Sequence, residues 1–532
     1  MRARVFVAAV LLYRCGTPTK DSDPSSVAVL PMTNLSADPS ESDYLADGIA
    51  QAVTARLTQA GLRVIPWDTA RRYRESEHPA NAIARELNVD AVLVGTFQLS
   101  EEEILLNLSL VDAETGFQSW ADILVEPYEN VFQMQLEIAR SVASSLKRTL
   151  TGEEERALAS AESRSTEAYD LYLQGSYLMM EEAEEDTNVA LEYFTRARDL
   201  DPDLADAHVG VGAVYQARYA NGWGGLENLE KAQSSYEAAL RSSPSSARAR
   251  RGLIYLDWER GSSERCLSRG REAARFGAPN DVEALLAQAV AYQLCGLPDR
   301  SVPLLERALE IDPRNQAAQF RLVISLTWSG DRPRAIEAGQ AYFASFGDDP
   351  EIHVWVGVSQ HLLGHVEPAW EHYQKAIEWK GRAEGSVLRA LYYAGFLFDT
   401  NGKPERAREI WERGVELTLS RLKDDPEQVR LRFYLACFNG LLHQDGFSQK
   451  KGRSLESSDL NAVEMRYLAI VHAWRGDEAR AVAILRDALR RGRLDSAWKV
   501  GFAAASVSWQ NATFAPFVRE HRELEERLRR MY

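Results

Sequence analysis

Cysteine is scarce in the sequence and never occurs in the paired spacing of a metal site. The 532 residues include only four cysteines, at Cys15, Cys266, Cys295 and Cys437. Without a CxxC pair, this pattern indicates neither a zinc cage nor a disulfide framework. The last three lie in apolar helical segments, so we expect small buried side chains there rather than reactive thiols.

Positive charge and long apolar runs are also scarce. The chain has 62 lysine and arginine residues against 78 aspartate and glutamate residues, for a formal net charge of -16. Such a chain repels a phosphate backbone, so no nucleic-acid partner is expected. Beyond the N-terminal segment, no run approaches the roughly 20 apolar residues of a membrane-spanning helix.

The composition is otherwise ordinary for a globular protein, with 45% hydrophobic and 26% charged residues. A chain of 532 residues is too long for one compact core. At least two folding units are therefore expected.

Residues 1–24 form a candidate signal or anchor segment. Two arginines and the apolar run 5–13 precede Cys15, which is the order of a short secretory signal with a lipid-accepting cysteine. Arg14 departs from the small residue that a lipoprotein signal peptidase expects. Three interpretations stay open: a weak signal or lipoprotein leader with Cys15 as the lipidation site, the end of a longer membrane helix, or a disordered tail. An anchored chain would lie outside the cytoplasm, in the periplasm, and the alternative location is the cytoplasm.

Residues 25–150 alternate between strand and helix patterns. The expected strands are 27–31, 62–66, 89–99, a segment from Ile104 to a turn at 112–116, and 117–125. The expected helices are 41–59, 79–87 and 131–150. Together these patterns predict a small α/β domain with a mixed sheet.

Several motifs in this domain occur in a recognisable order. AVLP, NLS and YLADGI are followed by IARELNVDAVLVG and LVDAETG. This order resembles the TolB-like amino-terminal domain of bacterial multidomain proteins, with Met32 as a departure where an aromatic residue is expected. The resemblance implies no catalytic residues in the domain. The resemblance also implies that the domain occurs together with adenylate cyclase, protein kinase or winged-helix modules, that a membrane segment lies nearby, and that tetratricopeptide repeats follow the domain.

Residues 160–492 have the period of such repeats. Four equivalent positions lie 34 residues apart, at Leu267, Ser301, Ala335 and Ala369. A small residue lies twelve positions earlier in the first helix of a pair, as Gly357 does before Ala369. Small residues let paired helices approach closely. We predict an all-α superhelix of about eight repeats, some of them degenerate, with residues 493–532 forming capping helices.

The first helices of the repeats should line a groove that suits an extended peptide or a partner helix. Counting from the small residues gives five candidate groove residues: Gln293, His361, Arg389, Tyr392 and Asp399. A second candidate contact is Trp223, in an insertion between glycines, which could instead pack on its own repeats.

The segments that resemble enzymatic or metal-binding motifs all lack part of the required pattern. The segment 210–215 begins like a dinucleotide fingerprint but lacks its third glycine and lies within a helix. The loop 446–454 has the wrong glycine spacing for a phosphate loop. His361, His365 and His372 have no acid pair to complete a zinc site. We therefore expect no catalytic activity, cofactor or metal.

Two functions remain. The first is a non-enzymatic scaffold or sensor module of the bacterial envelope that binds protein partners. The alternative is the sensory or regulatory half of a signalling system linked to an adenylate cyclase, a kinase or a transcription regulator. A cyclase, kinase or DNA-binding domain encoded in frame before Met1 would favour the alternative.

Overall fold

A computed structural model describes most of the chain. The described residues are 26–39, 42–74, 76–100, 103–146, 151–152, 155, 165–179, 184–220, 225–277, 280–380, 383–423, 428–443, 462–492 and 498–532. Cys15, Trp223 and the loop 446–454 lie outside them. None of the described helices is both long enough and apolar enough to span a membrane.

The N-terminal unit is built on a six-stranded mixed sheet. Its strands are β1 Ser26–Val29, β2 Thr33–Asn34, β3 Arg63–Val64, β4 Ala91–Ser100, β5 Glu103–Asp112 and β6 Gln118–Pro127. The order is β3-β1-β4-β5-β6, and β2 also pairs with β4. β1 pairs in parallel with β3 and β4, whereas β4, β5 and β6 form an antiparallel meander.

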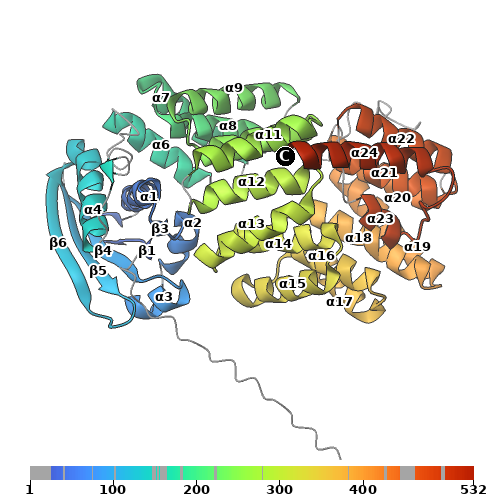
Figure 1. Cartoon of the computed structure of the whole chain (residues 1–532), viewed down its shortest axis with the longest axis horizontal. Helices are drawn as coiled ribbons and strands as arrows, with labels where there is room; N and C mark the ends of the chain where they lie inside the picture. The colour runs from blue at the N-terminus through green and yellow to red at the C-terminus, as the bar shows by residue number, and fades with distance from the viewer. Residues whose placement is uncertain are drawn as a thin grey trace, which may run out of the picture.

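Helices cover one face of this sheet (Figure 1). They are α1 Asp43–Gln59 and α4 Val131–Ser145, with the shorter α2 Trp67–Ala70, η2 Arg71–Tyr73, α3 Ala80–Glu86 and η3 Tyr128–Asn130 at the edges. Alternation along β5 explains the arrangement: Ile104, Leu106 and Leu108 are buried against the helices. Their neighbours along the strand point to the opposite face.

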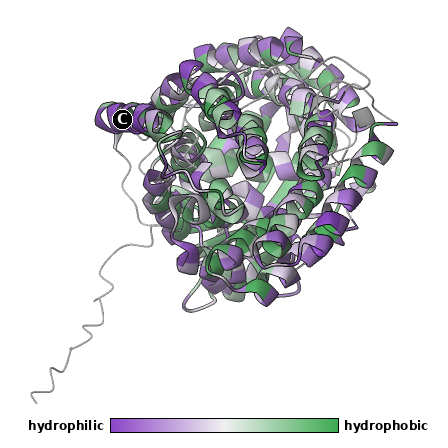
Figure 2. Ribbon diagram, turned by 90° about the vertical axis from the view of Figure 1, so that its right-hand side faces the viewer, coloured by the Kyte–Doolittle hydropathy of each residue, from purple (hydrophilic) through white to green (hydrophobic). Residues whose placement is uncertain are grey.

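Helices make up the rest of the chain. Their bounds are α6 Thr166–Leu178, α7 Glu184–Leu200, α8 Ala205–Ala220, α9 Glu227–Ser242, α10 Ala247–Glu259, α11 Ser263–Phe276, α12 Val282–Leu294, α13 Pro298–Ile311, α14 Gln316–Ser329, α15 Arg332–Phe346, α16 Pro350–Leu362, α17 Val366–Ile377, α18 Glu384–Thr400, α19 Pro404–Arg421, α20 Val429–Leu441, α21 Ala462–Trp474, α22 Glu478–Arg490, α23 Trp498–Ala504 and α24 Ala515–Met531. Successive helices pair and wind into a tetratricopeptide-like superhelix, which in Figure 2 encircles the view as a ring. The predicted fold class is confirmed.

The α/β unit is attached to the repeats at two places far apart in sequence. At the first repeat helix, Tyr169 donates a hydrogen bond of 3.0 Å to the carbonyl of Gly48 in α1. At the end of α13, the Thr69 hydroxyl donates to Asp312 Oδ2 at 2.7 Å, and both side chains are buried. Burial raises the pKa of Asp312, and the hydrogen bond from Thr69 opposes that rise. These contacts hold the α/β unit against the middle of the superhelix.

The C-terminal helix α24 also returns to the middle of the chain (Figure 1). Its first part contacts α22, and its last turns reach α11, α12 and α13. There Arg529 forms an ion pair of 2.7 Å with Asp299, and Leu528 is fully buried beside Leu267. The helix is therefore more than a cap on the last repeat, because it connects the last repeats with the central ones.

Replacing Thr69 by Val should loosen the attachment of the α/β unit. The valine removes the hydroxyl that bonds to Asp312 but keeps the volume, so we expect a loss of about 1–2 kcal/mol in the free energy of unfolding. Thr54→Val is the matched control, because the Thr54 hydroxyl bonds to the Ala50 carbonyl within its own helix. Hydrogen exchange should accelerate over 67–74 in the Thr69 variant alone. Equal exchange in both variants would contradict the structural role of this contact.

Candidate binding site on the inner face of the repeats

The inner face of the superhelix is formed by the first helix of each pair. In the C-terminal half of the chain this face is already occupied by other parts of the molecule. The short helix α23 packs against α16, α18 and α21. Trp498 and Phe502 of α23 are buried in the same hydrophobic core as Tyr392 and Tyr467. This half of the inner face therefore offers a partner little open surface.

Gln293 and Tyr392, two of the predicted groove residues, lie in the interior. Gln293 is 1% exposed and donates hydrogen bonds to the Arg321 carbonyl at 2.9 Å and to Ser325 at 2.8 Å. Tyr392 is fully buried, with its ring centroid 4.8 Å from that of Tyr467. The prediction that these two side chains face a partner is corrected, because other parts of the same chain cover them.

The other three predicted residues also have internal partners. Arg389 is paired with Glu351 and stacks over the Trp355 ring. Asp399 accepts a hydrogen bond of 3.1 Å from the Trp474 indole. His361 is 9% exposed, and burial lowers its pKa to about 4. Arg389, Tyr392 and Asp399 share helix α18, whereas Gln293 and His361 lie on α12 and α16.

The inner face stays accessible at α10, α12 and α14, where the structure assembles a charged surface. We call it the inner basin and define it by Arg248, Arg251, Tyr255, Glu283 and Arg321. The side chains of Arg248 and Arg251 are 42% and 30% exposed. They lie one turn apart on α10, so both point to the same side.

Hydrogen bonds fix the basin arginines in place. Arg248 donates to the Tyr172 hydroxyl at 3.2 Å, and Arg251 is paired with Glu283. Arg321 donates to Gln293 Oε1 at 2.9 Å and to the Tyr255 hydroxyl, and its guanidinium lies over the Tyr255 ring. No ion pair between Arg321 and a described carboxylate was found. Fixed arginine forks of this kind suit the recognition of carboxylates.

Electrostatics at the basin keep its arginines charged. Tyr172 is the largest cause of the raised pKa of Arg248, and Asp206 and Asp68 add to it. Glu283 is the largest cause of the raised pKa of Arg251. Asp68 belongs to α2, so the α/β unit contributes an acidic group to the surroundings of the basin.

Sequence analysis missed the basin because α10 lacks the small residue from which positions were counted. Tyr255 occupies that place, twelve positions before Leu267. Arg248 and Arg251 lie seven and four residues before Tyr255, whereas Arg389 and Tyr392 lie six and three before Gly395. Counting at the offsets used for the other repeats therefore does not reach the two arginines.

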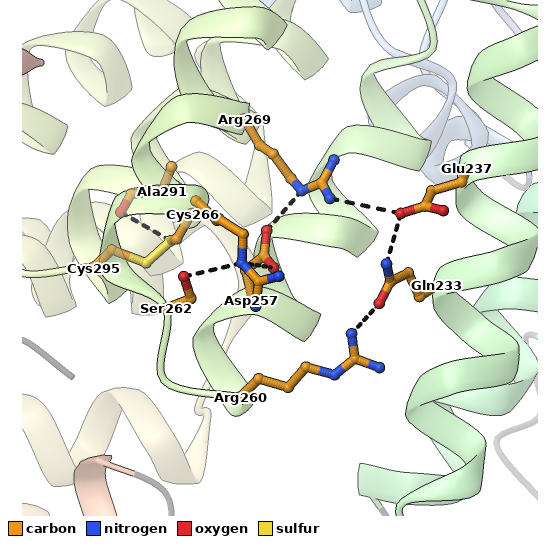
Figure 3. Close-up of polar contacts among 10 residues, drawn as sticks. Gln233, Glu237, Asp257, Arg260, Ser262, Cys266, Arg269, Ala291 and Cys295 are labelled. Carbon is orange, nitrogen blue, oxygen red and sulfur yellow. Dashed lines mark hydrogen bonds and ion pairs between the residues drawn. A yellow bond between two sulfur atoms is a disulfide. The ribbon is translucent and has the colours of Figure 1, made fainter. Parts of the chain in front are cut away.

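A disulfide lies next to this site. Cys266 of α11 is bonded to Cys295 at the end of α12, with their Cα atoms 6.3 Å apart (Figure 3). Both cysteines are buried, and Cys437 is buried as well. Burial was predicted, but the expectation of no disulfide is wrong because α11 and α12 are adjacent and bring the two residues together. Figure 3 also shows Arg269 of α11 bound to Asp257 of α10 at 2.7 Å.

In the part of the chain that the structure describes, no three or more His, Cys, Asp or Glu residues form a group suited to a metal ion. Of the three histidines rejected as a zinc site, His372 lies with its Nδ1 2.8 Å from His353 Nδ1, and both rings stack on Phe343. Burial lowers the pKa of His372 to about 4.

Comparison with known proteins finds similarity over parts of the chain. Residues 23–140 match the family described as HilA/YgeH-like transcriptional regulator, second domain. A putative adenylate cyclase 3 of Rhizobium meliloti is 29% identical over 239 residues, which are 44% of this chain and 40% of that protein. Anaphase-promoting complex subunit 3 of Schizosaccharomyces pombe is 21% identical over 202 residues, or 38% and 29% of the two chains. The TolB-like resemblance is not confirmed and stays a prediction.

Solved structures of similar fold are repeat proteins. PilW, a type IV pilus biogenesis factor, matches 42% of this chain and 98% of its own, with 18% identity and a TM-score of 0.35. A tetratricopeptide repeat protein from Parabacteroides merdae matches 51% and 98%, with 14% identity and a TM-score of 0.37. The human IFIT1 dimer with PPP-AAAA matches 67% and 78%, with 14% identity and a TM-score of 0.42. These similarities concern the fold alone.

Acidification from about pH 6.5 to about pH 4 should destabilise the protein through its buried histidines. In the unfolded chain a histidine binds a proton near pH 6.5, but buried His361 binds one only near pH 4. The free energy of unfolding does not depend on His361 above the unfolded pKa of about 6.5, and it decreases as the pH falls to the folded pKa of about 4. The decrease amounts to roughly 3 kcal/mol for one such group.

The measurement is urea unfolding of His361→Gln across this pH range. The variant should show a shallower loss of stability than the wild type. His365→Gln is the control, because His365 is exposed just after the same helix. An unchanged pH dependence in His361→Gln would show that His361 takes up its proton in the folded state as readily as in the unfolded chain.

Proposed function

We propose that this chain is a non-enzymatic regulatory scaffold whose inner basin binds an acidic segment of a protein partner. The observation that carries the proposal is the pair of Arg248 and Arg251 side chains, which are 42% and 30% exposed on the inner face. Hydrogen bonds already hold these groups, so little conformational entropy is lost when a carboxylate binds.

The chemistry of the basin favours a peptide with carboxylates and an aromatic or apolar side chain. Arg321 donates hydrogen bonds to uncharged groups, Gln293 and Tyr255, which leaves its charge available to a carboxylate of the partner. Tyr255 adds a ring surface beside that charge. The overall charge of -16 weakens long-range attraction of an acidic partner, so contact specificity must come from the basin itself.

A regulatory role fits the sequence relatives better than a purely structural one. The region similar to the putative adenylate cyclase covers 40% of that protein, and the α/β unit matches a domain of transcriptional regulators. The second candidate function is therefore the sensory or regulatory part of such a signalling system. In both cases the chain acts by binding a partner protein and by transmitting the bound state to the rest of the system.

A location in the bacterial envelope is part of this proposal. Disulfides persist in oxidising compartments such as the periplasm and are rare in the cytoplasm. The bond between Cys266 and Cys295 supports such a location, in agreement with the leader-like order of residues 1–24. Lipidation at Cys15 would anchor the chain there.

Reversing the charge of the inner basin should remove the preference of the protein for acidic peptides. A displayed random-peptide library panned on the full chain should enrich carboxylate-containing peptides. Arg251→Glu combined with Arg321→Glu should weaken those peptides about tenfold or more, because each acid then repels the ligand. Arg334→Glu is the control, since Arg334 pairs with Glu306 on the second helices of two neighbouring pairs.

The readout is the dissociation constant of the enriched peptides, with circular dichroism to verify folding. Equal binding by the wild type and the double variant would reject the inner basin as the binding site. Loss of binding in Arg334→Glu as well would indicate a general charge effect.

The state of the cysteines in living cells tests the location. Thiols trapped in intact cells should show Cys266 and Cys295 protected in the wild type, and a fully reduced pair would contradict an envelope location. In the purified protein, Cys266→Ser with Cys295→Ser should lower the free energy of unfolding by about 3.5 kcal/mol, because the bond closes a 29-residue separation. Cys437→Ser is the matched control, because Cys437 is a buried cysteine outside this bond.

A further inference from the structure

The second half of the C-terminal helix α24, residues 522–532, is attached to the repeats by few contacts. We call this segment the strap. The first half of α24 packs against α22, with Phe517 and His521 buried. Within 522–532, all of which the structure describes, Leu528 is the one buried side chain. A segment with so few buried apolar contacts detaches at a lower free energy than a core helix does.

Polar contacts fix the strap to a surface that we call the strap site. It consists of Glu264 and Arg271 of α11, Tyr292 of α12, and Asp299 and Arg300 of α13. Asp299 accepts hydrogen bonds of 2.7 and 2.8 Å from the Arg529 guanidinium. Glu264 accepts one of 2.6 Å from Arg527, and the other three residues of the site donate to backbone oxygens of the strap. Both ion pairs are partly exposed, so each contributes little to stability.

The disulfide joins the two halves of the strap site. Cys266 lies on α11 and Cys295 lies at the end of α12, just before α13 (Figure 3). Each residue of the strap site is within five residues of one of these cysteines. Leu528 of the strap is fully buried in the same hydrophobic cluster as both cysteines. The strap is therefore docked on the two segments that the disulfide links, and it helps to cover the bond.

We propose that the disulfide and the strap form a redox-sensitive latch in which each protects the other. The disulfide holds both halves of the strap site at the spacing that the strap needs, so less ordering is required when the strap docks. The docked strap covers the disulfide and slows its reduction, because thiol exchange depends on access to the sulfur atoms. At equilibrium the coupling between the bond and docking is reciprocal. This inference does not depend on the inner basin.

The latch opens by thiol–disulfide exchange with a dithiol reductant. One thiolate of the dithiol attacks a sulfur of the Cys266–Cys295 bond, which breaks and leaves a mixed disulfide. The second thiolate of the dithiol then displaces the remaining protein sulfur. The protein gains two electrons and two protons as two cysteine thiols, and the dithiol becomes a disulfide. Once the strap detaches, α24 no longer connects the last repeats with the central ones.

The rate of reduction tests the cover that the strap provides. The oxidised full chain is treated with dithiothreitol, and alkylation with mass spectrometry follows the thiols of Cys266 and Cys295. Arg529→Glu should accelerate their appearance about tenfold or more, because it places a like charge beside Asp299. Adding Asp299→Arg should slow the reduction again, and Arg522→Glu, at an exposed position of the same helix, is the control. Circular dichroism verifies folding. Equal rates in the wild type and Arg529→Glu would overturn the proposal.

Hydrogen exchange tests the effect of the disulfide on the strap, without a substitution in α24. In Cys266→Ser with Cys295→Ser, the strap amides should exchange about fivefold faster or more, which is the lower end of the usual coupling between linked sites. Residues 515–521 of the same helix, which pack against α22, are the internal reference, and Cys437→Ser is the control variant. Unchanged exchange of the strap would overturn the latch. An equal acceleration over 515–521 would show a general loss of stability and would overturn it as well.

Discussion

The superhelix depends on close contact between a bulky ring on one helix and glycine on the helices beside it. A Cβ atom added at Gly357 would lie 2.8 Å from the Tyr373 ring, closer than packed side chains approach. Gly212 and Gly252 both meet the ring of Tyr236 in the same way. Each ring fixes the distance and the angle at which the next helix pair packs. The small rotation between successive pairs is repeated along the chain and adds up to the superhelical turn.

That turn brings distant parts of the chain to the inner face. Tyr392 meets Tyr467, and α23 covers α16 and α18, so the C-terminal part of the inner face becomes core. The central part is less covered, so the side chains of Arg248 and Arg251 are 42% and 30% exposed, whereas that of Arg389 is 22% exposed. The same winding lets α24 reach α11 and α13.

Local sequence patterns predicted the helices and strands but not which distant parts of the chain cover them. The turn before β6, the mixed sheet and the 34-residue period all follow from neighbouring residues, and the structure has them. The inward direction of Gln293 and Tyr392 was also predictable, because position in a repeat determines it. Their burial was not, since it depends on side chains such as Arg321 and Tyr467, 28 and 75 residues away. The disulfide and the contact of Thr69 with Asp312 could not be predicted from local patterns for the same reason.

The α/β unit and the inner basin are linked through the short helix α2. Thr69 of α2 holds Asp312 in the turn between α13 and α14, and the adjacent Asp68 contributes to the raised pKa values of Arg248 and Arg251. An acidic partner bound in the basin as proposed would share these guanidinium groups with Asp68. Its repulsion of Asp68 would act on α2, which also contacts α1, β1 and Asp312. The proposed binding would in this way be coupled energetically to the attachment of the α/β unit, which is the property that a regulatory scaffold requires.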